Sequence, residues 1–392
     1  MRTLLPWFFS SFSRPGSRQV AAVLLALAAF AGSAVSAQTP NRIAPDADFA
    51  RPMVLPNHHP QWANASNSVG LVPQNLPLER MTLVLARSPE QEQAFESFLA
   101  NQQNPASLDY HHWLTPAEVG DRFGLSEADI ATITGWLQSQ GLHVNWVSPS
   151  RLFIGFGGTA ANVGRAFQTE LHHYKVNGVE RMSVSSDPTI PQALVPAIKS
   201  IRGLYTIPEH PMHSMAAPRT AMPDANSSNG EHFLAPADFA AIYNIPPGST
   251  GAQFTIGIVS WSRTDFADFD NFRQKTGNYF SNPTEVVPTA FGGIDPGPAY
   301  TSPPAATVDL SGQVEATLDV LRAGSVAPGA NLLLVASPSS ATSSGIGEDA
   351  QYMVQTTPVP VQVMTISFGD CESSGGAGRG AVLGPALPAG RL

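Results

Sequence analysis

The sequence predicts an α/β protein built from two successive parts, each with its own sheet. In residues 76–205, short strands and helices alternate, and two strands are adjacent in the middle. In residues 254–367, three apolar runs are separated by helical segments. Alternation of this kind is typical of layered α/β folds, and continuous apolar runs are typical of strands buried on both faces of a parallel sheet. We therefore expect a small α/β sandwich followed by a doubly wound parallel sheet.

The elements expected in the first part follow one another closely. Thr115-Pro-Ala-Glu118 has the form of a capping box with proline at the first helical position. The expected strands cover residues 81–87, 144–147, 151–156 and 171–175, and the expected helices cover residues 89–100, 116–123, 126–141, 159–167 and 193–201. This order suits a ferredoxin-like α/β sandwich. Residues 206–233 lose periodicity and are expected to form an exposed linker.

The second part begins near residue 234. Strands are expected at residues 254–260, 331–336 and 361–367, helices at 265–276, 312–323 and 345–355, and a long loop at 279–306. This β-α-β-α-β order is typical of a doubly wound sheet. After Glu372 the sequence has neither helical nor strand periodicity. We expect residues 373–392 to be an aberrant tail that leaves the sheet incomplete, and a frameshift or truncation after Glu372 would explain both this tail and the lone Cys371.

The composition indicates a globular and weakly charged protein. The 392 residues are 43% apolar and 13% charged, with a net charge of −9, which leaves room for two domains with a sizeable core. An acidic chain is a poor partner for nucleic acid or anionic membranes. Neither is therefore expected as a partner.

The N-terminus has the three-part pattern of a secretory signal. Arg2, Arg14 and Arg18 precede the apolar run 20–31, and the small residues Val35-Ser36-Ala37 follow it. The run is shorter than the roughly 20 residues that span a bilayer. We expect residues 1–37 to be a signal peptide, residues 38–53 to be irregular, and the mature chain to be secreted (extracellular or periplasmic). A membrane anchor is the alternative.

Two acidic residues, Glu315 and Asp319, lie one turn apart in the helix expected at 312–323. This spacing puts both carboxylates on the same helix face, and each follows a member of the apolar stripe that contains Val314 and Leu318. Two close carboxylates share protons, and one pKa is raised. Residues 233–392 contain no histidine, so a hydrolase in this part needs another general base. A solvated helix face is the alternative interpretation.

Several motifs in order resemble the sedolisin (serine-carboxyl peptidase) family. They are His111-His-Trp-Leu-Thr-Pro-Ala-Glu118, Leu152-Phe-Ile-Gly-Phe-Gly157, Leu234-Ala-Pro-Ala-Asp238, Gly312-Gln-Val-Glu-Ala-Thr-Leu-Asp319, Ala327-Pro-Gly-Ala330 and Ile366-Ser-Phe-Gly-Asp-Cys-Glu372. Residues 54–205 resemble its pro-kumamolisin activation domain, and residues 234–372 resemble part of its catalytic domain. The resemblance implies a subtilisin-like fold and a serine-type endopeptidase precursor (EC 3.4.21). Such a precursor acts at acid pH on protein or peptide substrates and is inhibited by its own activation domain.

In this resemblance, Glu315 matches the family's general base and Asp319 matches the acid that orients it. The family's nucleophile lies in a Gly-Thr-Ser motif and its oxyanion aspartate in a Gly-Asp-Ser-Gly motif, and neither motif occurs here. The family's calcium site would lie in the missing C-terminal part, so no cofactor or metal is expected in this chain. We expect the catalytic domain to be truncated and the chain to be inactive as given.

Two other functions compete with this prediction. The first is a non-catalytic propeptide-type module that folds alone and inhibits or chaperones a related peptidase. The second is a subtilisin-type Ser-His-Asp enzyme, which the histidine-free stretch 233–392 disfavours. The adjacent histidine pairs 58–59, 111–112 and 172–173 are poor metal chelators, because neighbouring residues of a strand point to opposite faces. We hypothesise that protonation of His111 and His112 as the pH falls loosens the inhibitory interface of the activation domain.

Overall fold

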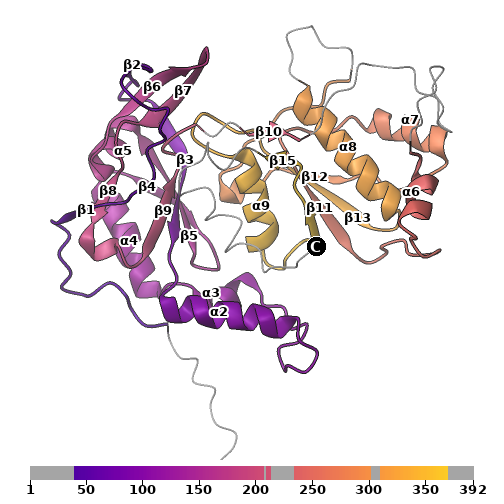
Figure 1. Cartoon of the computed structure of the whole chain (residues 1–392), viewed down its shortest axis with the longest axis horizontal. Coiled ribbons are helices and arrows are strands. Elements are labelled where there is room, and N and C mark those ends of the chain that lie inside the picture. Colours follow the sequence, from indigo (N-terminus) through magenta and orange to yellow (C-terminus); the bar gives the residue numbers. More distant parts are fainter. Residues whose placement is uncertain (1–38, 207–208, 213–233, 302–309, 370–392) are drawn as a thin grey trace, which may run out of the picture. The chain divides into compact units, whose positions relative to one another are not determined.

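The computed structural model (Figure 1) describes residues 39–206, 209–212, 234–301 and 310–369. It has the mixed α/β character that the sequence predicts. The signal segment 1–37, the tail 373–392 and Cys371 lie outside the described residues. Among the described residues, no helix combines the length and the apolar composition that crossing a membrane requires.

The first part contains a four-stranded antiparallel sheet. Its strands run in the order β4 (His143–Val147), β5 (Phe153–Thr159), β3 (Pro77–Leu85) and β9 (Ile198–Arg202). Helices α4 (Glu127–Ser139) and α5 (Ala160–Phe167) share a core with the sheet, in which the most buried side chains are aliphatic or aromatic: Leu83, Ile133, Leu137, Ile154, Phe156, Val163, Phe167 and Ile201. Burial of this apolar surface stabilises the first part.

Helices α2 (Pro89–Gln102) and α3 (Pro116–Phe123) begin where the sequence predicts. The Ser88 and Thr115 side chains each accept a hydrogen bond from the backbone three residues on, and Gln91 and Glu118 bond back to complete two capping boxes. Each capping box satisfies donors that a helix end otherwise leaves unpaired.

The predicted helix at residues 193–201 is wrong. Its first residues form the short 3₁₀ turn η1 (Gln192–Leu194), and Ile198–Arg202 form β9, which pairs with β3. Pro196 interrupts the segment, and proline inside a helix removes a hydrogen bond and clashes with the preceding turn. The apolar residues Ile198 and Ile201 therefore belong to a strand and are buried there.

Two small antiparallel sheets complete the first part. One consists of β2 (Ser68–Leu71), β6 (Leu171–Val176) and β7 (Val179–Val184), and the other pairs β1 (Pro52–Val54) with β8 (Thr189–Pro191). Strand β7 was not predicted. It follows Asn177-Gly178, both at positive φ, which is the signature of a two-residue hairpin turn.

The second part is organised around a four-stranded parallel sheet. The strand order is β12 (Thr284–Val286), β13 (Asn331–Ala336), β11 (Thr255–Ser260) and β14 (Val363–Thr365). The sequence predicted the three apolar strands β11, β13 and β14 but assigned residues 279–306 to a loop, which is wrong for β12. Strand β12 consists of Thr284-Glu-Val286 and therefore contains no apolar run.

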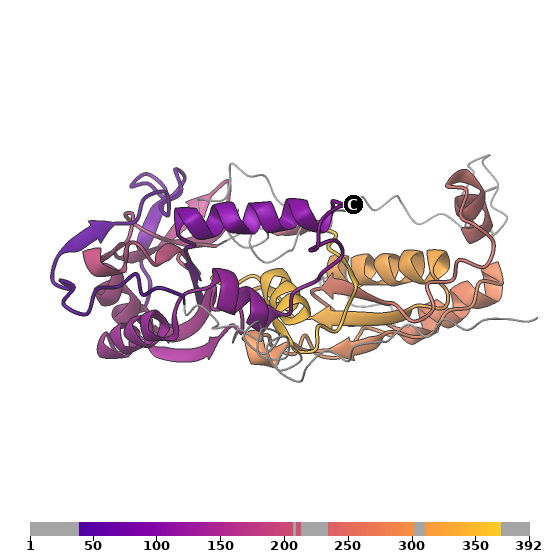
Figure 2. The same cartoon turned by 90° about the horizontal axis from the view of Figure 1, so that it is seen from below.

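Helices pack on both faces of this sheet (Figures 1 and 2). Side chains from β11 and β13 meet α7 (Phe266–Thr276) and α8 (Ser311–Val326) in one cluster, which contains Ile258, Phe269, Val320, Leu332 and Leu334. The neighbouring side chains of the same strands meet α9 (Gly345–Gln355) in a second cluster, which contains Val259, Leu333, Val335, Ile346 and Met353. Because both faces are covered, the central residues of these strands are apolar. A short helix, α6 (Pro236–Ile242), precedes them.

Candidate active site

Helix α8 carries both carboxylates of the predicted acid pair. Glu315 is 2% exposed, and Ala316 and Val320 beside it are buried against the sheet. Asp319 follows one turn later and is partly buried. The pair therefore lies at the boundary of the core and not on a solvated helix face.

The first turn of α8 approaches the end of β11 closely. A Cβ atom built on Gly312 would lie 2.9 Å from the Ser262 hydroxyl and 3.2 Å from the Trp261 Cβ atom. With contacts this short, a side chain at residue 312 would force Ser262 and Trp261 to shift. The glycine thus lets the helix that holds Glu315 sit against the carboxyl end of a sheet strand, where ligand sites of parallel sheets form.

The Asp319 side chain contacts the segment that follows β14. The Ser367 hydroxyl donates a hydrogen bond of 2.9 Å to Asp319 Oδ1. Ser367 precedes the short strand β15 (Phe368–Gly369). This contact therefore brings helix α8 together with the described residues 366–369 of the Ile366–Glu372 motif. A role for Ser367 was not predicted.

A segment of the expected linker pairs with β15. Strand β10 (His210–Pro211) runs antiparallel to it, with His210 opposite Gly369 and Pro211 opposite Phe368. The Met212 N–H then donates a 2.9 Å hydrogen bond to the Ser367 carbonyl. The prediction that the whole of residues 206–233 lacks regular structure is thus wrong for the described residues 210–211, while residues 207–208 and 213–233 lie outside the described ranges.

The residue before β10 anchors the same segment. Glu209 accepts hydrogen bonds from the Ser339 hydroxyl, at 2.6 Å, and from the Ser344 hydroxyl. Ser344 also caps the N-terminus of α9 through the Gly347 N–H. Residues 209–212 are therefore held by a strand pairing and by a carboxylate at a helix start, where negative charge is favourable.

Two aromatic rings border this region. The rings of Trp261 and Phe368 lie 4.8 Å apart between centroids at an interplanar angle of 44°. The pair gives β15 an apolar neighbour, which suits contact with peptide side chains.

A second polar cluster, which the sequence did not reveal, contains Arg80, Glu348 and Ser337. The Arg80 Nε–H donates to Glu348 Oε1 at 2.7 Å and Arg80 Nη2 contacts Oε2. The Ser337 hydroxyl donates to Glu348 Oε2 at 3.1 Å. Burial raises the pKa of Glu348 to about 7, while the Arg80 guanidinium acts in the opposite direction. Arg80 and Glu348 are 268 residues apart, so no local pattern could have joined them.

The neighbouring carboxyl group, Asp349, is fully buried. Its Oδ2 accepts a 3.2 Å hydrogen bond from the Ser260 N–H at the end of β11. Burial raises the pKa of Asp349 well above its usual range, and the nearby Glu348 charge raises it further. Desolvation of a carboxylate favours its neutral form, so protonated Asp349 suits this position.

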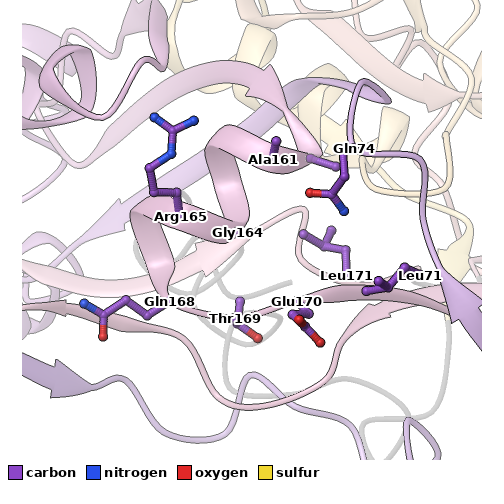
Figure 3. Close-up of a pocket in the computed structure, with 10 residues that line it drawn as sticks. Leu71, Gln74, Ala161, Gly164, Arg165, Gln168, Thr169, Glu170 and Leu171 are labelled. Carbon is purple, nitrogen blue, oxygen red and sulfur yellow. The ribbon is translucent and has the colours of Figure 1, made fainter.

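Two hollows in the described residues lie apart from these contacts. A cavity of about 430 Å³ lies in the first part between α5 and strands β2 and β6, with Gln74, Arg165 and Glu170 among its lining residues (Figure 3). A second hollow of about 310 Å³ borders α8 at Gln313, Val314 and Thr317, together with Asp265 and Asp268. Burial raises the pKa of Asp268, and the charge of Asp265 adds to this effect. Within the described ranges, no group of three or more His, Cys, Asp or Glu side chains is arranged to hold a metal ion.

Comparison with known proteins identifies relatives of both parts. Residues 64–207 match the family model described as the pro-kumamolisin activation domain. The chain is 27% identical to xanthomonalisin of Xanthomonas sp. (strain T-22) over 191 residues, which are 47% of this chain and 23% of that protein. It is 25% identical to sedolisin of Pseudomonas sp. (strain 101) over 277 residues, 70% of this chain and 45% of the relative.

A third relative is kumamolisin of Bacillus sp. (strain MN-32), with 25% identity over 253 residues, 64% of this chain and 44% of the relative. The chain thus spans less than half the length of the three relatives described here. The family-model match ends at residue 207, whereas the matches to sedolisin and kumamolisin are too long to be confined to those residues. These relatives therefore bear on residues outside the activation domain as well.

Proposed function

We propose that this chain, which matches a pro-kumamolisin activation domain and is similar to precursors of the sedolisin family, is part of a secreted serine-type endopeptidase (EC 3.4.21) that acts at acid pH. Glu315 is the general base and Asp319 orients it. The observation that carries this proposal is the packing of buried Glu315 one turn from Asp319, with Asp319 bonded to Ser367 at the start of β15. We further propose a ferredoxin-like first part and a subtilisin-like second part, which the sheet orders support.

The chemistry follows the logic of a Ser-His-Asp triad with a carboxylate in place of imidazole. Glu315 takes the proton of a serine hydroxyl as that oxygen attacks the peptide carbonyl, and returns the proton to the leaving amine. A carboxylate is a weak base, so it performs this transfer best when its pKa lies near an acid working pH. The Gly-Thr-Ser and Gly-Asp-Ser-Gly motifs are absent from this sequence. We therefore propose that the chain as given is inactive and that a downstream segment supplies the nucleophile, the oxyanion aspartate and the calcium site, with no cofactor on the residues present.

We also propose that the first part and the segment after it inhibit the catalytic part intramolecularly. Strand β10 adds to β15 as a peptide substrate adds to a sheet edge, through main-chain hydrogen bonds. Its neighbour Ser367 bonds to Asp319, so the bound segment lies close to the proposed catalytic acids. A protein or peptide substrate must displace residues 209–212 before it can pair with the same edge.

The peptidase proposal is tested in a chain extended by the downstream reading frame that carries both missing motifs. Autoprocessing at about pH 4 is expected to slow by roughly 10²–10⁴-fold in the Glu315→Gln variant, the usual contribution of a general base. Processing is measured by gel and mass spectrometry. The matched control is Glu127→Gln, an exposed glutamate on α4, which should process normally. If Glu315→Gln processes at the parental rate, the assignment of Glu315 is wrong.

A second candidate function is inhibition of a related peptidase by the activation domain. The observation that favours it is that residues 64–207 match an activation domain and contain an extensive core of their own. The full chain, added to an active sedolisin-type peptidase at pH 4–5, is expected to inhibit hydrolysis of a fluorogenic peptide without cleaving that peptide itself. Undiminished hydrolysis at a large molar excess of intact chain would exclude this function.

A further inference from the structure

The guanidinium group of Arg80 is surrounded by acceptors of the second part. Its Nε–H and Nη2 contact the two oxygens of Glu348 as a fork. Nη1 donates to the Pro338 carbonyl at 3.1 Å, and Nη2 lies 3.1 Å from the Ser337 hydroxyl and from the same carbonyl. Three kinds of acceptor from the loop after β13 and from α9 therefore converge on one planar cation.

These acceptors are buried and fixed. The side chains of Arg80 and Glu348 are each 11% exposed, and Ser337 is fully buried. The Ser337 hydroxyl is held from behind by the Ile294 N–H at 3.1 Å and by its own bond to Glu348. The acceptors thus keep one another in position, as a preorganised binding site requires.

Aromatic residues close the side of this cluster. The rings of Trp146 and Phe291 meet edge to face at 5.4 Å between centroids. A Cβ atom built on Gly292, next to Phe291, would lie 3.9 Å from both Arg80 Cγ and Glu348 Oε1. The apolar wall therefore shields the ion pair from water and strengthens its electrostatics.

The arrangement distinguishes a guanidinium from an ammonium group. A guanidinium presents its N–H donors in a rigid plane that matches both oxygens of a carboxylate, whereas an ammonium is a compact point charge with three donors. Arg80 bonds to Glu348 through Nε and Nη2, and at the same time its Nη1 and Nη2 donate to the Pro338 carbonyl and the Ser337 hydroxyl. A lysine cannot reproduce this set from one nitrogen atom.

We propose that Glu348, Ser337 and the Pro338 carbonyl form a guanidinium-selective binding site, which Arg80 occupies in this chain and which accepts a free alkylguanidinium or the arginine side chain of another peptide when residue 80 is vacated. The proposal concerns binding alone and does not depend on peptidase activity. It also gives a physical reason for arginine at the contact between β3 and α9.

The test is chemical rescue of the Arg80→Ala variant of the full chain. The variant is expected to melt at a lower temperature than the parent. Propylguanidinium at millimolar concentration should raise its Tm by about 2 °C when present near ten times its Kd, while propylammonium at the same concentration and ionic strength should not. The parent, whose site is filled, should show no difference between the two salts.

Two further variants make the outcome unambiguous. Arg151→Ala removes an arginine whose Nη2 bonds to the exposed carboxylate of Asp121 and whose Nε donates to the Leu125 carbonyl. It makes no fork to a carboxylate, and its variant should show no selective rescue. Arg80→Gln replaces Arg80→Ala if the latter does not fold, since its amide retains one donor nitrogen. Equal effects of propylguanidinium and propylammonium on the Arg80 variant would overturn the proposal.

Discussion

The free energy of unfolding is expected to rise by on the order of 3 kcal/mol as the pH falls from about 8 to about 4, through proton uptake by Glu348. Burial raises the pKa of this carboxyl group from 4.5 to about 7 in the folded chain, against the opposing hydrogen bonds of Arg80 and Ser337. Between these two values the folded chain holds a proton that the unfolded chain has lost. The stabilisation is therefore complete below pH 4.5 and disappears as the pH rises through about 7.

The Glu348→Gln variant isolates this contribution. Glutamine cannot titrate, so the variant should lose the part of the rise in stability that Glu348 contributes between neutral and acid pH. Asp349, whose pKa burial raises well above its usual range, should retain a pH dependence of the same sign. Urea unfolding, followed by tryptophan fluorescence at several pH values, measures the slope of the free energy of unfolding against pH. The control variant Glu127→Gln should have the same slope as the parent. An unchanged slope in Glu348→Gln would refute the assignment.

Replacement of His58 by alanine is expected to lower the free energy of unfolding by about 2–4 kcal/mol at pH 7.5, because it leaves a cavity and an unpaired donor. His58 is fully buried. Its Nε2 accepts a 3.0 Å hydrogen bond from the Ile201 N–H in β9, and its Nδ1 lies 3.0 Å from the Pro56 carbonyl and 3.1 Å from that of Leu55. Nε2 as acceptor and Nδ1 as donor require the neutral imidazole.

Because the geometry requires neutral His58, the loss of stability in His58→Ala should depend on pH. Burial lowers the pKa of His58 below 6.5, although the two carbonyls and the Asp187 carboxylate act to raise it. Its contribution is therefore complete above pH 6.5 and is lost as the pH falls through the folded-state pKa. The difference between parent and His58→Ala should narrow at pH 5. The exposed His112, changed to glutamine, is the control and should alter stability little at either pH. If the free energies of unfolding of the parent and of His58→Ala differ by the same amount at pH 7.5 and at pH 5, this role of neutral His58 is wrong.

Local signals account for the parts of the fold that the sequence predicted well. Ser88 and Thr115 mark helix starts because their side chains cap the next turn, and the structure shows both capping boxes. The predicted strand at 331–336 and helix at 345–355 agree with β13 and α9. The predicted helix at 193–201 is wrong because Pro196 interrupts the segment, whose later residues pair with β3 as a strand. Strand β12 was missed because Thr284-Glu-Val286 contains no apolar run.

Long-range contacts account for what the sequence could not predict at the candidate site. The spacing of Glu315 and Asp319 follows from one helical turn, and their shared helix is confirmed. The bond from Ser367 to Asp319 and the fork between Arg80 and Glu348 depend instead on tertiary packing. A capped helix is encoded within a few residues, whereas these contacts join elements that become neighbours only after the sheets have formed.

The pairing of β10 with β15 also determines how strongly a free peptide must bind in order to compete for the β15 edge. Residues 209–212 share a chain with β15, so their association is intramolecular and acts at an effective concentration that is typically on the order of millimolar for short connections. A free peptide with the same affinity must reach that concentration to compete for the edge. A cut in the chain between residue 212 and β15 would remove this covalent link and lower the effective concentration of residues 209–212 at the edge. Such a cut would lower the occupancy of the edge, although it changes none of the hydrogen bonds of the pairing.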